Sequence, residues 1–253
     1  MLTFRNSSPM RQGSTQTHSI PGTSVAESWK MFDRIAERYD VLNRVLSFRR
    51  DVAWRKFLYE KLPDGCGLKV LDLATGTGDV LLGLAAAGDK VAAGVGVNKS
   101  AKMLAVGKRK VEERRLTRAV TLLRGDASAL GVMGESFDVA TMAFGIRNVP
   151  NVPETLREIW RVLKPEGRVL ILEFSLPRNR IIRGLYLFYF RNILTRIGAF
   201  VSGDRHAYRY LNRTVEEFPR GEAFCSILRE AGFKNVRAHP LTFGVAKLYE
   251  GDK

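Results

Sequence analysis

The sequence predicts an α/β protein built around a parallel sheet that is buried on both faces. Short apolar runs alternate with helical segments from Lys69 onward, which is the pattern of successive βαβ units. The runs are mostly apolar along their whole length, as expected for strands that helices cover on both sides. The run VLDLATGTGDV (70–80) ends in a turn with two glycines before a helix begins. Doubly wound sheets bind their ligands at such junctions.

The first 26 residues contain no Asp or Glu and are rich in Ser, Thr and Arg. This composition is typical of a disordered tail or of an organellar targeting peptide, and we expect disorder. No repeat or long linker divides the remainder. Residues 27–253 are therefore expected to form a single domain.

The helical elements expected first lie before Pro63. Apolar residues recur at helical spacing in ESWKMFDRIAERYDVLNRVLS (27–47), and DVAWRKFLYEKL (51–62) is a second amphipathic segment. Strands are expected at 69–74, 90–97, 119–126, 137–144 and 168–174. Near the C-terminus, residues 227–251 are predicted to form a helix, a strand, a turn and a strand.

Residues 178–213 interrupt the alternation of strands and helices. They combine many aromatic and arginine residues with a single acid, Asp204. We expect a helical cap inserted between strands. It either covers a ligand pocket and turns a basic side to an anionic surface, or packs as ordinary helices whose arginines extend to water.

The formal net charge of +15 indicates a partner that carries negative charge. Nucleic acid, an anionic membrane surface and an acidic ligand all fit, and so do basic side chains that merely face solvent. Cys66 and Cys225 form no CxxC pair, and the three histidines lack ligand spacing, so neither a disulfide framework nor a metal site is expected. No apolar run reaches the roughly 18 residues that a membrane-spanning helix needs.

The glycine turn favours a cationic ligand. Gly76 and Gly78 are followed neither by the third glycine of the dinucleotide fingerprint nor by the Lys-Ser/Thr of a phosphate loop. Asp79 would oppose a phosphate, because the N-terminal end of a helix is where anions bind. S-adenosylmethionine carries a sulfonium and an ammonium and no phosphate, so we expect it as the cofactor.

The ends of the later strands support this expectation. Asp126 ends the third strand, where its carboxylate can accept from an adenine amino group. Arg147 and Asn148 follow the fourth strand, near the point where the reacting groups should meet. Taken singly, each of these residues is weak evidence, because an Asp at a strand end is commonly a helix cap. Taken in order along the chain, they are stronger evidence.

These residues resemble those of the ubiquinone/menaquinone biosynthesis C-methyltransferases, which are class I S-adenosylmethionine-dependent enzymes. The matching segments include MFDRIAERYDVLN, LDLATGTGD, SFDVATMAFGIRNV, RVLKPEGR, YRYLNRTVEEFP and the closing LTFGVAKLYEG. The resemblance implies a Rossmann-like class I methyltransferase fold. That fold has a seven-stranded mostly parallel sheet with an antiparallel last hairpin, an N-terminal helical lid (27–62) and a helical insertion (178–213) before the final strands.

The resemblance also implies methylation of a ring carbon on a polyprenylated quinol. Conversion of demethylmenaquinol to menaquinol is the first choice, and 2-methoxy-6-polyprenyl-benzoquinol methylation in ubiquinone synthesis is the alternative. The implied cofactor-binding residues are Gly76, Thr77, Gly78, Asn98, Asp126, Ala127 and Ala143. The implied catalytic residues are Arg147, Asn148 and Tyr39. Arginine does not serve as a free base, so we expect Arg147 to stabilise the quinolate while an ordered water relays the proton.

Three positions depart from the family's pattern. Asn98 and then Lys99 stand where the second strand usually ends in an acid that grips the ribose hydroxyls. Losing the charge-assisted hydrogen bonds is expected to weaken cofactor binding by about 1–2 kcal/mol. A site for the 2′-phosphate of NADP is the alternative, although the missing third glycine argues against it. Arg49 replaces a usual glycine, and Ala143 replaces a serine found in some members.

The polyprenyl tail of the implied substrate stays in a bilayer. We therefore expect a transient contact between the basic exterior and an anionic membrane surface. The expected location is cytoplasmic, peripheral at the inner face of the membrane, or organellar if residues 1–26 are a transit peptide. A homodimer is compatible with the sequence.

Two rival functions are kept open. The charge allows an RNA methyltransferase, but no Asn/Asp-Pro-Pro-aromatic motif follows the fourth strand, so nucleic acid is not expected as a partner. The change at Asn98 allows a non-catalytic prenylquinone-binding protein that has lost its cofactor.

Overall fold

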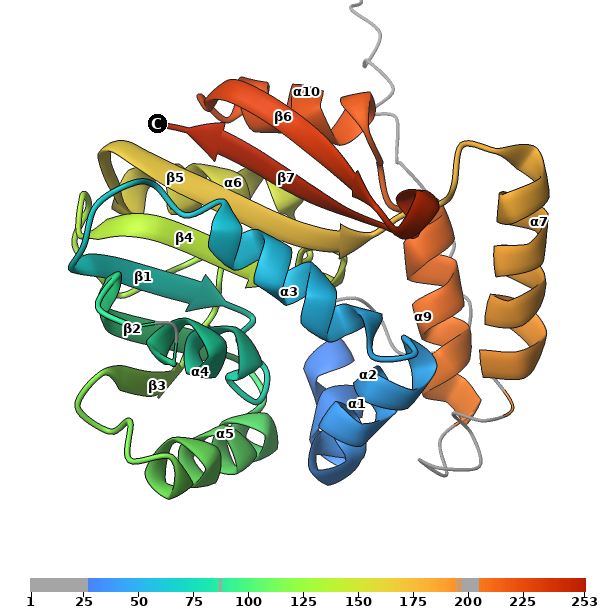
Figure 1. Cartoon of the computed structure of the whole chain (residues 1–253), viewed down its shortest axis with the longest axis horizontal. Helices are drawn as coiled ribbons and strands as arrows, with labels where there is room; N and C mark the ends of the chain where they lie inside the picture. The colour runs from blue at the N-terminus through green and yellow to red at the C-terminus, as the bar shows by residue number, and fades with distance from the viewer. Residues whose placement is uncertain (1–26, 87, 195, 197–204) are drawn as a thin grey trace, which may run out of the picture.

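The computed structural model describes residues 27–86, 88–194, 196 and 205–253. The predicted tail 1–26 and parts of the predicted cap, 195 and 197–204, lie outside the described residues. Seven strands form one sheet in the order β3-β2-β1-β4-β5-β7-β6 (Figure 1). Their bounds are β1 Leu68–Leu73, β2 Val91–Asn98, β3 Val120–Arg124, β4 Phe137–Ala143, β5 Leu163–Phe174, β6 Lys234–Leu241 and β7 Ala246–Asp252.

The sheet is parallel from β3 to β5 and antiparallel at its far edge. β1 pairs with β2 and β4, β2 with β3, and β4 with β5, all in parallel, whereas β7 runs antiparallel to both β5 and β6. The predicted seven-stranded, mostly parallel sheet with an antiparallel last hairpin is therefore confirmed. The strand order reverses beside β1, which is where sheets of this kind bind ligands outside the carboxyl ends of the strands.

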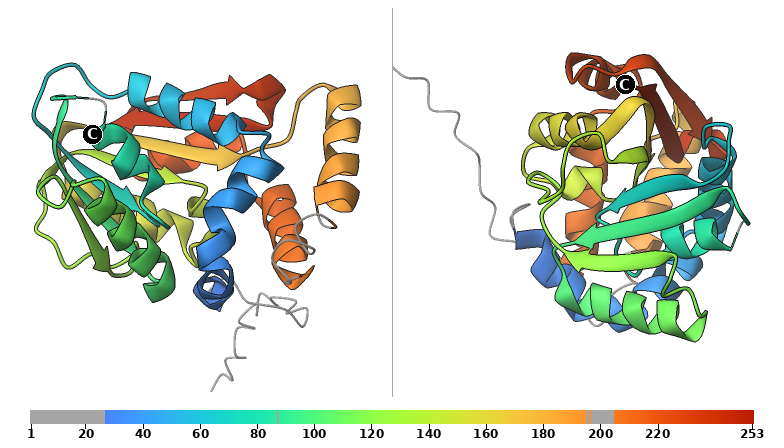
Figure 2. Two further views of the ribbon diagram at one scale, coloured as in Figure 1. Left: turned by 60° about the horizontal axis from the view of Figure 1, so that its bottom comes forward. Right: turned by 90° about the vertical axis from the view of Figure 1, so that its left-hand side faces the viewer.

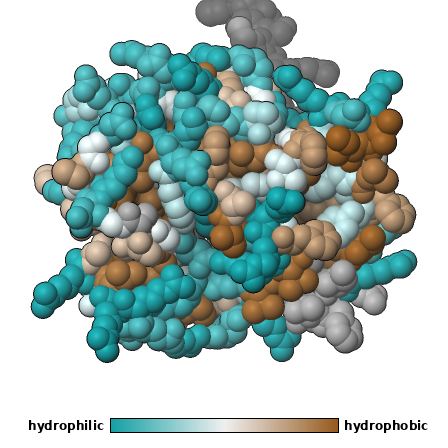
Figure 3. Space-filling model, in the orientation of Figure 1, coloured by the Kyte–Doolittle hydropathy of each residue, from teal (hydrophilic) through white to brown (hydrophobic). Residues whose placement is uncertain are grey.

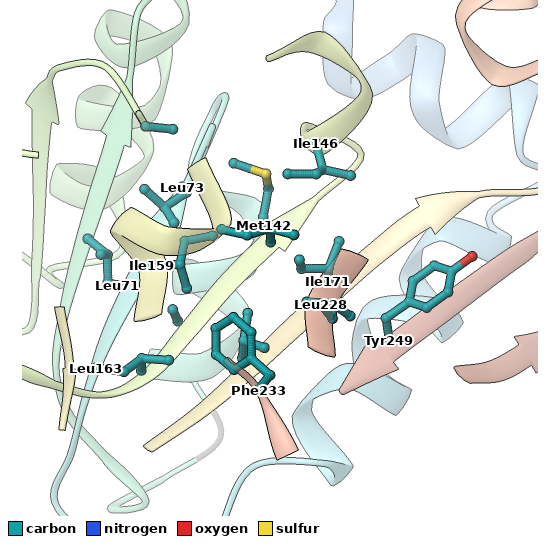
Figure 4. Close-up of a cluster of buried hydrophobic side chains, with 14 of the residues drawn as sticks. Leu71, Leu73, Met142, Ile146, Ile159, Leu163, Ile171, Leu228, Phe233 and Tyr249 are labelled. Atoms are coloured by element: carbon teal, nitrogen blue, oxygen red, sulfur yellow. The ribbon is translucent and has the colours of Figure 1, made fainter. Parts of the chain in front are cut away.

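Helices bury both faces of this sheet. Leu71 and Leu73 of β1 point to a cluster that includes Ile159 of α6 (Val152–Val162) and Leu228 of α10 (Glu222–Glu230) (Figure 4). Val70, the residue before Leu71, points to the opposite face and belongs to a second cluster formed with α3 (Arg50–Glu60), α4 (Asp79–Ala85) and α5 (Ala101–Glu113). Successive strand residues point to opposite faces, so the apolar runs read from the sequence serve both clusters.

Two helical groups stand at the carboxyl end of the strands (Figures 1 and 2). The first comprises α1 (Ser28–Ile35), the 3₁₀ turn η2 (Ala36–Arg38) and α2 (Tyr39–Leu46). The second comprises α7 (Arg180–Phe188), the π turn η4 (Tyr189–Leu194) and α9 (Arg205–Glu217). A buried cluster joins the two groups through Met31, Leu42, Leu176, Phe190, Leu194, Tyr210 and Val215.

The first helical segment is interrupted rather than continuous. α1 and η2 pack against α5, whereas α2 packs against α3. The 3₁₀ turn changes the direction of the chain, so that α1 packs against α5 and α2 packs against α3. A second difference lies at β3, which ends at Arg124, so that Asp126 belongs to the following loop rather than to the strand.

None of the helices in the described part of the chain has the length and apolar character needed to cross a bilayer. Within the same residues, no group of three His, Cys, Asp or Glu side chains is placed to hold a metal ion.

Candidate active site

The chain between β1 and α4 forms a tight turn at the carboxyl end of β1. Ala74, Gly76 and Gly78 have φ values of 50°, 59° and 80°. Glycine adopts this left-handed region without steric cost, which explains the two glycines of the motif. Gly78 is the N-cap of α4, which begins at Asp79.

Asp72 fixes the turn from below. Its buried carboxylate accepts hydrogen bonds from Thr75 Oγ1 and Thr141 Oγ1, each at 2.6 Å. Burial raises the pKa of Asp72 to about 6, although the two hydrogen bonds lower it. Thr75 belongs to the turn and Thr141 to β4, so Asp72 ties the turn to the neighbouring strand.

A cavity of about 90 Å³, here named the turn cavity, lies beside the glycine turn and beneath α1. Five of the seven predicted cofactor-binding residues line it: Gly76, Asn98, Asp126, Ala127 and Ala143. Thr77 instead lines a smaller cavity of about 20 Å³ beside Asp72 and Asp79. Gly78 lines neither cavity and packs next to Leu122.

Asp126 and Asn98, which both line the turn cavity, differ in how many of their hydrogen-bonding positions the protein already occupies. Lys99 Nζ lies 2.6 Å from Asp126 Oδ2, and Ser128 donates to Asp126 Oδ1 from its N and Oγ at 3.0 and 2.9 Å. Burial alone would raise the pKa of Asp126, but these hydrogen bonds outweigh it and the pKa lies below its usual range. A carboxylate has about four acceptor positions, so one remains for a ligand donor. The side-chain amide of Asn98 has no partner in the described part of the chain.

Asp79 has a different role from the one that the sequence suggested. It was expected to complement a cationic ligand, but three protein cations already surround its carboxylate. Lys110 Nζ lies at 2.5 Å, Arg44 Nη2 at 2.8 Å and Arg55 Nη1 at 3.8 Å. Burial raises the pKa of Asp79, yet these cations bring it below the usual value. The charge of Asp79 therefore joins α2, α3 and α5 to the turn.

Thr77 takes part in the same contacts. Its Oγ1 donates to Asp40 Oδ1 at 2.6 Å, and Lys110 Nζ lies 2.8 Å from Asp40 Oδ2. The side-chain hydroxyl of Thr77 thus holds α2 against the turn.

A second and larger cavity of about 410 Å³, here named the lid cavity, lies between the two helical groups. Its walls come from α1, α2, α3, α7, η4 and α9 and from the ends of β4 and β5, and they are mainly aromatic and aliphatic. Phe32, Tyr39 and Phe144 line both the lid cavity and the turn cavity. Ligands in the two cavities would therefore both contact these three side chains.

Arg147 reaches the lid cavity from η3 (Ile146–Asn148), directly after β4. Its guanidinium forms an ion pair with the fully buried Glu173, and Nη1 donates to the Phe144 carbonyl at 2.9 Å. Arg147 Nε is buried and has no hydrogen-bond partner among the described residues, so one donor is left for a ligand.

Asn148 and Tyr39 complete the predicted catalytic set. Asn148 lines the turn cavity, donates to the Phe144 carbonyl at 3.3 Å and accepts from Tyr210 Oη at 3.1 Å. Tyr39 packs edge-on against Phe32, with ring centres 6.1 Å apart. Burial raises the pKa of Tyr39 and its hydrogen bond with Asn43 lowers it, with a net rise, so the phenol is neutral at neutral pH.

Sequence reasoning missed Glu173, Tyr186 and Tyr210. Glu173 could have been found, because it is the only acid in the apolar run VLILEF. Tyr186 lines the lid cavity with a buried hydroxyl that has no partner in the described part of the chain, and burial raises its pKa. Tyr186 and Tyr210 gave no signal, since aromatic residues are abundant throughout 178–213.

Comparison with known proteins identifies the relatives of this chain. The model of the ubiE/COQ5 methyltransferase family matches residues 23–253. The ubiquinone/menaquinone biosynthesis C-methyltransferase UbiE of Geotalea daltonii is 43% identical over 224 residues, which cover 88% of this chain and 95% of that protein. The demethylmenaquinone methyltransferase of Thermus thermophilus is 43% identical over 225 residues, covering 88% of this chain and 100% of that protein.

Solved structures share the fold at lower identity. An S-adenosylmethionine-dependent methyltransferase from Thermotoga maritima superposes with a TM-score of 0.63 at 21% identity, covering 89% of this chain and 99% of that one. One from Aquifex aeolicus gives a TM-score of 0.57 at 16% identity, covering 88% and 97%.

Proposed function

Because the chain belongs to the ubiE/COQ5 methyltransferase family and is an S-adenosylmethionine-dependent C-methyltransferase, we propose that it methylates demethylmenaquinol to menaquinol. The observation that carries this proposal is the pair of adjoining cavities. The larger one is mainly apolar, has the volume usual for a small-molecule site and borders the turn cavity through Phe32, Tyr39 and Phe144. A benzoquinol ring is the second candidate, because several relatives are named for both ubiquinone and menaquinone.

The residues of the turn cavity suit the cofactor. Asn98 offers a free amide at the end of β2, and Asp126 keeps one acceptor position. We assign the ribose hydroxyls to Asn98 and the adenine amino group to Asp126. When bound, S-adenosylmethionine supplies a methyl group on a positively charged sulfur.

In the proposed reaction the ring carbon attacks the methyl group in line, the bond between methyl and sulfur breaks, and S-adenosylhomocysteine is the leaving group. The methylated ring carbon then loses its proton, and the ring oxygen regains one as the ring becomes aromatic again. Alignment of the two reactants supplies much of the rate. Arg147 Nε donates to the ring oxygen and stabilises the quinolate, which makes the neighbouring carbon nucleophilic. An ordered water accepts the hydroxyl proton of the quinol as the quinolate forms, since the guanidinium stays charged and cannot act as a base. Glu173 orients Arg147, and Tyr39 and Asn148 hold the reactants between them.

The assignment of Arg147 is tested with a variant that does not bury an unpaired charge. In Arg147→Met/Glu173→Gln both partners of the buried pair are neutral, whereas Arg147→Met alone would leave Glu173 uncompensated. We expect kcat for a short-chain, water-soluble demethylmenaquinol to fall about 10²- to 10³-fold. Calorimetric affinity for S-adenosylmethionine should change less than about twofold.

The matched control is Arg229→Met/Glu222→Gln, which neutralises an exposed ion pair on α10. An unchanged kcat in the buried-pair variant would show that Arg147 does not act on the quinol. Methyl transfer only to the benzoquinol analogue would replace the ring proposed, and transfer to neither quinol with the cofactor bound would reject the substrate class.

We extend the proposal to the enzyme's location. A polyprenylated quinol resides in a bilayer, so we place the enzyme as a peripheral protein at the anionic inner face of the membrane, with no role for nucleic acid. The net charge of +15 supports this extension.

A further inference from the structure

Helix α7 carries a stripe of exposed apolar side chains. Ile181, Leu185 and Phe188 are 74%, 68% and 61% exposed. Their spacing of four and three residues places them on one face of the helix. None of the residues of α7 is buried. Single exposed apolar residues are ordinary, but a continuous stripe marks an interaction surface.

The stripe adjoins the lid cavity. Phe48, 73% exposed, contacts Tyr189 with ring centres 5.5 Å apart, and both residues line that cavity. Tyr189 directly follows α7 along the chain. Hydrophobic residues gather over α7 at the right-hand edge of the molecule (Figure 3). The exposed apolar surface therefore continues into the wall of the cavity.

The charges around the stripe have one sign. Residues 175–194 contain four arginines and no acid. Arg191 is paired with Glu216, whereas Arg178, Arg180 and Arg183 have no acidic partner among the described residues. A second copy of this surface would face it with the same charge, which opposes pairing between copies. An anionic lipid surface offers both the opposite charge and an apolar interior.

We propose that the α7 face, defined as Ile181, Leu185 and Phe188 with Arg178, Arg180 and Arg183 around them, docks on an anionic lipid bilayer. The three apolar side chains enter the boundary between headgroups and acyl chains, and the arginines contact lipid phosphates. Docking in this orientation turns the lid cavity toward the lipid. The inference rests on the proposed function, because a polyprenylated substrate gives the lid cavity a reason to face a bilayer.

Binding to vesicles tests the proposal without any substrate. The purified enzyme is sedimented with neutral phosphatidylcholine vesicles and with vesicles containing phosphatidylglycerol. We expect at least tenfold tighter binding to the anionic vesicles, because each well-placed arginine strengthens binding about fivefold. Ile181→Ser/Leu185→Ser/Phe188→Ser should bind neither vesicle measurably, and Arg178→Gln/Arg180→Gln/Arg183→Gln should lose the preference for anionic lipid.

Controls carry matched changes on another surface. Met133→Ser removes an 82% exposed apolar side chain, and Lys108→Gln/Arg114→Gln/Arg118→Gln removes three charges on and after α5. Both should bind as the unaltered enzyme does. If the α5 variant lost the preference for anionic vesicles as fully as the α7 arginine variant does, net charge alone would explain the binding and the assignment to α7 would be overturned.

Two further readouts separate the possible failures. Turnover of the short-chain quinol without vesicles should be unchanged in both α7 variants, whereas turnover of a long-chain quinol in vesicles should fall at least tenfold. Failure of the unaltered enzyme on the short-chain quinol would reject the proposed function and leave the vesicle result standing. A dimer in sedimentation velocity that the serine variant abolishes would assign the α7 face to a second copy and overturn the lipid proposal.

Discussion

Asp72 combines complete burial with a structural task at the glycine turn. Its carboxylate holds Thr75 of the turn and Thr141 of β4, and burial raises its pKa from 3.8 to about 6. Between these two pH values the folded protein binds a proton that the unfolded chain releases. The contribution of Asp72 to stability is therefore lost as pH rises through this window and stays constant above it.

Substitution by asparagine removes this titration. Relative to Asp72→Asn, the unaltered protein should lose up to about 3 kcal/mol of unfolding free energy between pH 4 and pH 7. Urea unfolding of both proteins across this range measures the difference. Asp138→Asn is the control, because the contribution of Asp138 to the unfolding free energy should change with pH in the opposite direction. Burial raises the pKa of Asp138, but hydrogen bonds from Lys164 and Lys69 outweigh it and lower the pKa, so ionised Asp138 stabilises the fold as pH rises. Parallel curves for Asp72→Asn and the unaltered protein would contradict the prediction.

At the scale of elements, ionic contacts connect the N-terminal helices to α5, and α5 to the start of α4. Lys110 of α5 contacts Asp40 of α2 and Asp79 of α4, and Arg109 contacts Glu37 of η2 at 2.7 Å. An ion pair gains little at an exposed site, but Lys110 and Asp79 are largely buried, where water screens them less. These contacts fix where α1 and α2 stand over both cavities.

Lys110→Met should loosen the N-terminal helices without unfolding the sheet. Hydrogen exchange of the amides in α1 and α2 is expected to rise about tenfold, while β1 and β4 exchange as before, because local opening then costs less. Mass spectrometry of the exchanged peptides measures both. Lys108→Met, an exposed neighbour on the same helix, should change neither. Faster exchange everywhere would mean that Lys110 stabilises the whole domain.

The elements themselves were largely predictable, and their contacts were not. Apolar runs identified the strands because a strand covered on both faces needs apolar residues along its whole length. The interruption of the first helix at η2 depends on α5 and α3 lying in different directions, which no local pattern contains. The ion pairs of Asp79 could not be predicted for a similar reason. Its partners Arg44 and Lys110 lie 35 and 31 residues away, and only the folded chain brings them together.

At the scale of the whole molecule, the two cavities lie at the end of the sheet where the strand order reverses. The glycine turn located this end from sequence. The sequence predicted the lid (27–62) and a cap (178–213) that could cover a pocket. The lining of the lid cavity could not be predicted, because its walls combine helices of both segments with Phe144 and Phe174 between them. A ligand that binds only the folded state stabilises the entire domain.

S-adenosylhomocysteine at about 100 times its Kd should stabilise the fold by about 2.7 kcal/mol. For a domain of this size the Tm is then expected to rise about 5–10 °C. Asn98→Asp should bind about tenfold more tightly and gain a few degrees more at the same concentration, through charge-assisted hydrogen bonds to the ribose. Differential scanning calorimetry measures both shifts, with NADP as the control ligand. A rise in Tm with NADP alone would mean that Asn98 and Lys99 bind a phosphate.

The rings of Phe32 and Tyr39, which border both cavities, have a consequence for turnover. They lie on either side of η2, in α1 and at the first residue of α2, so residues 32–39 form part of the wall of both cavities. Because movement of this segment would open both cavities at once, we expect release of the methylated product and of the spent cofactor to be coupled, and release steps of this kind can limit turnover.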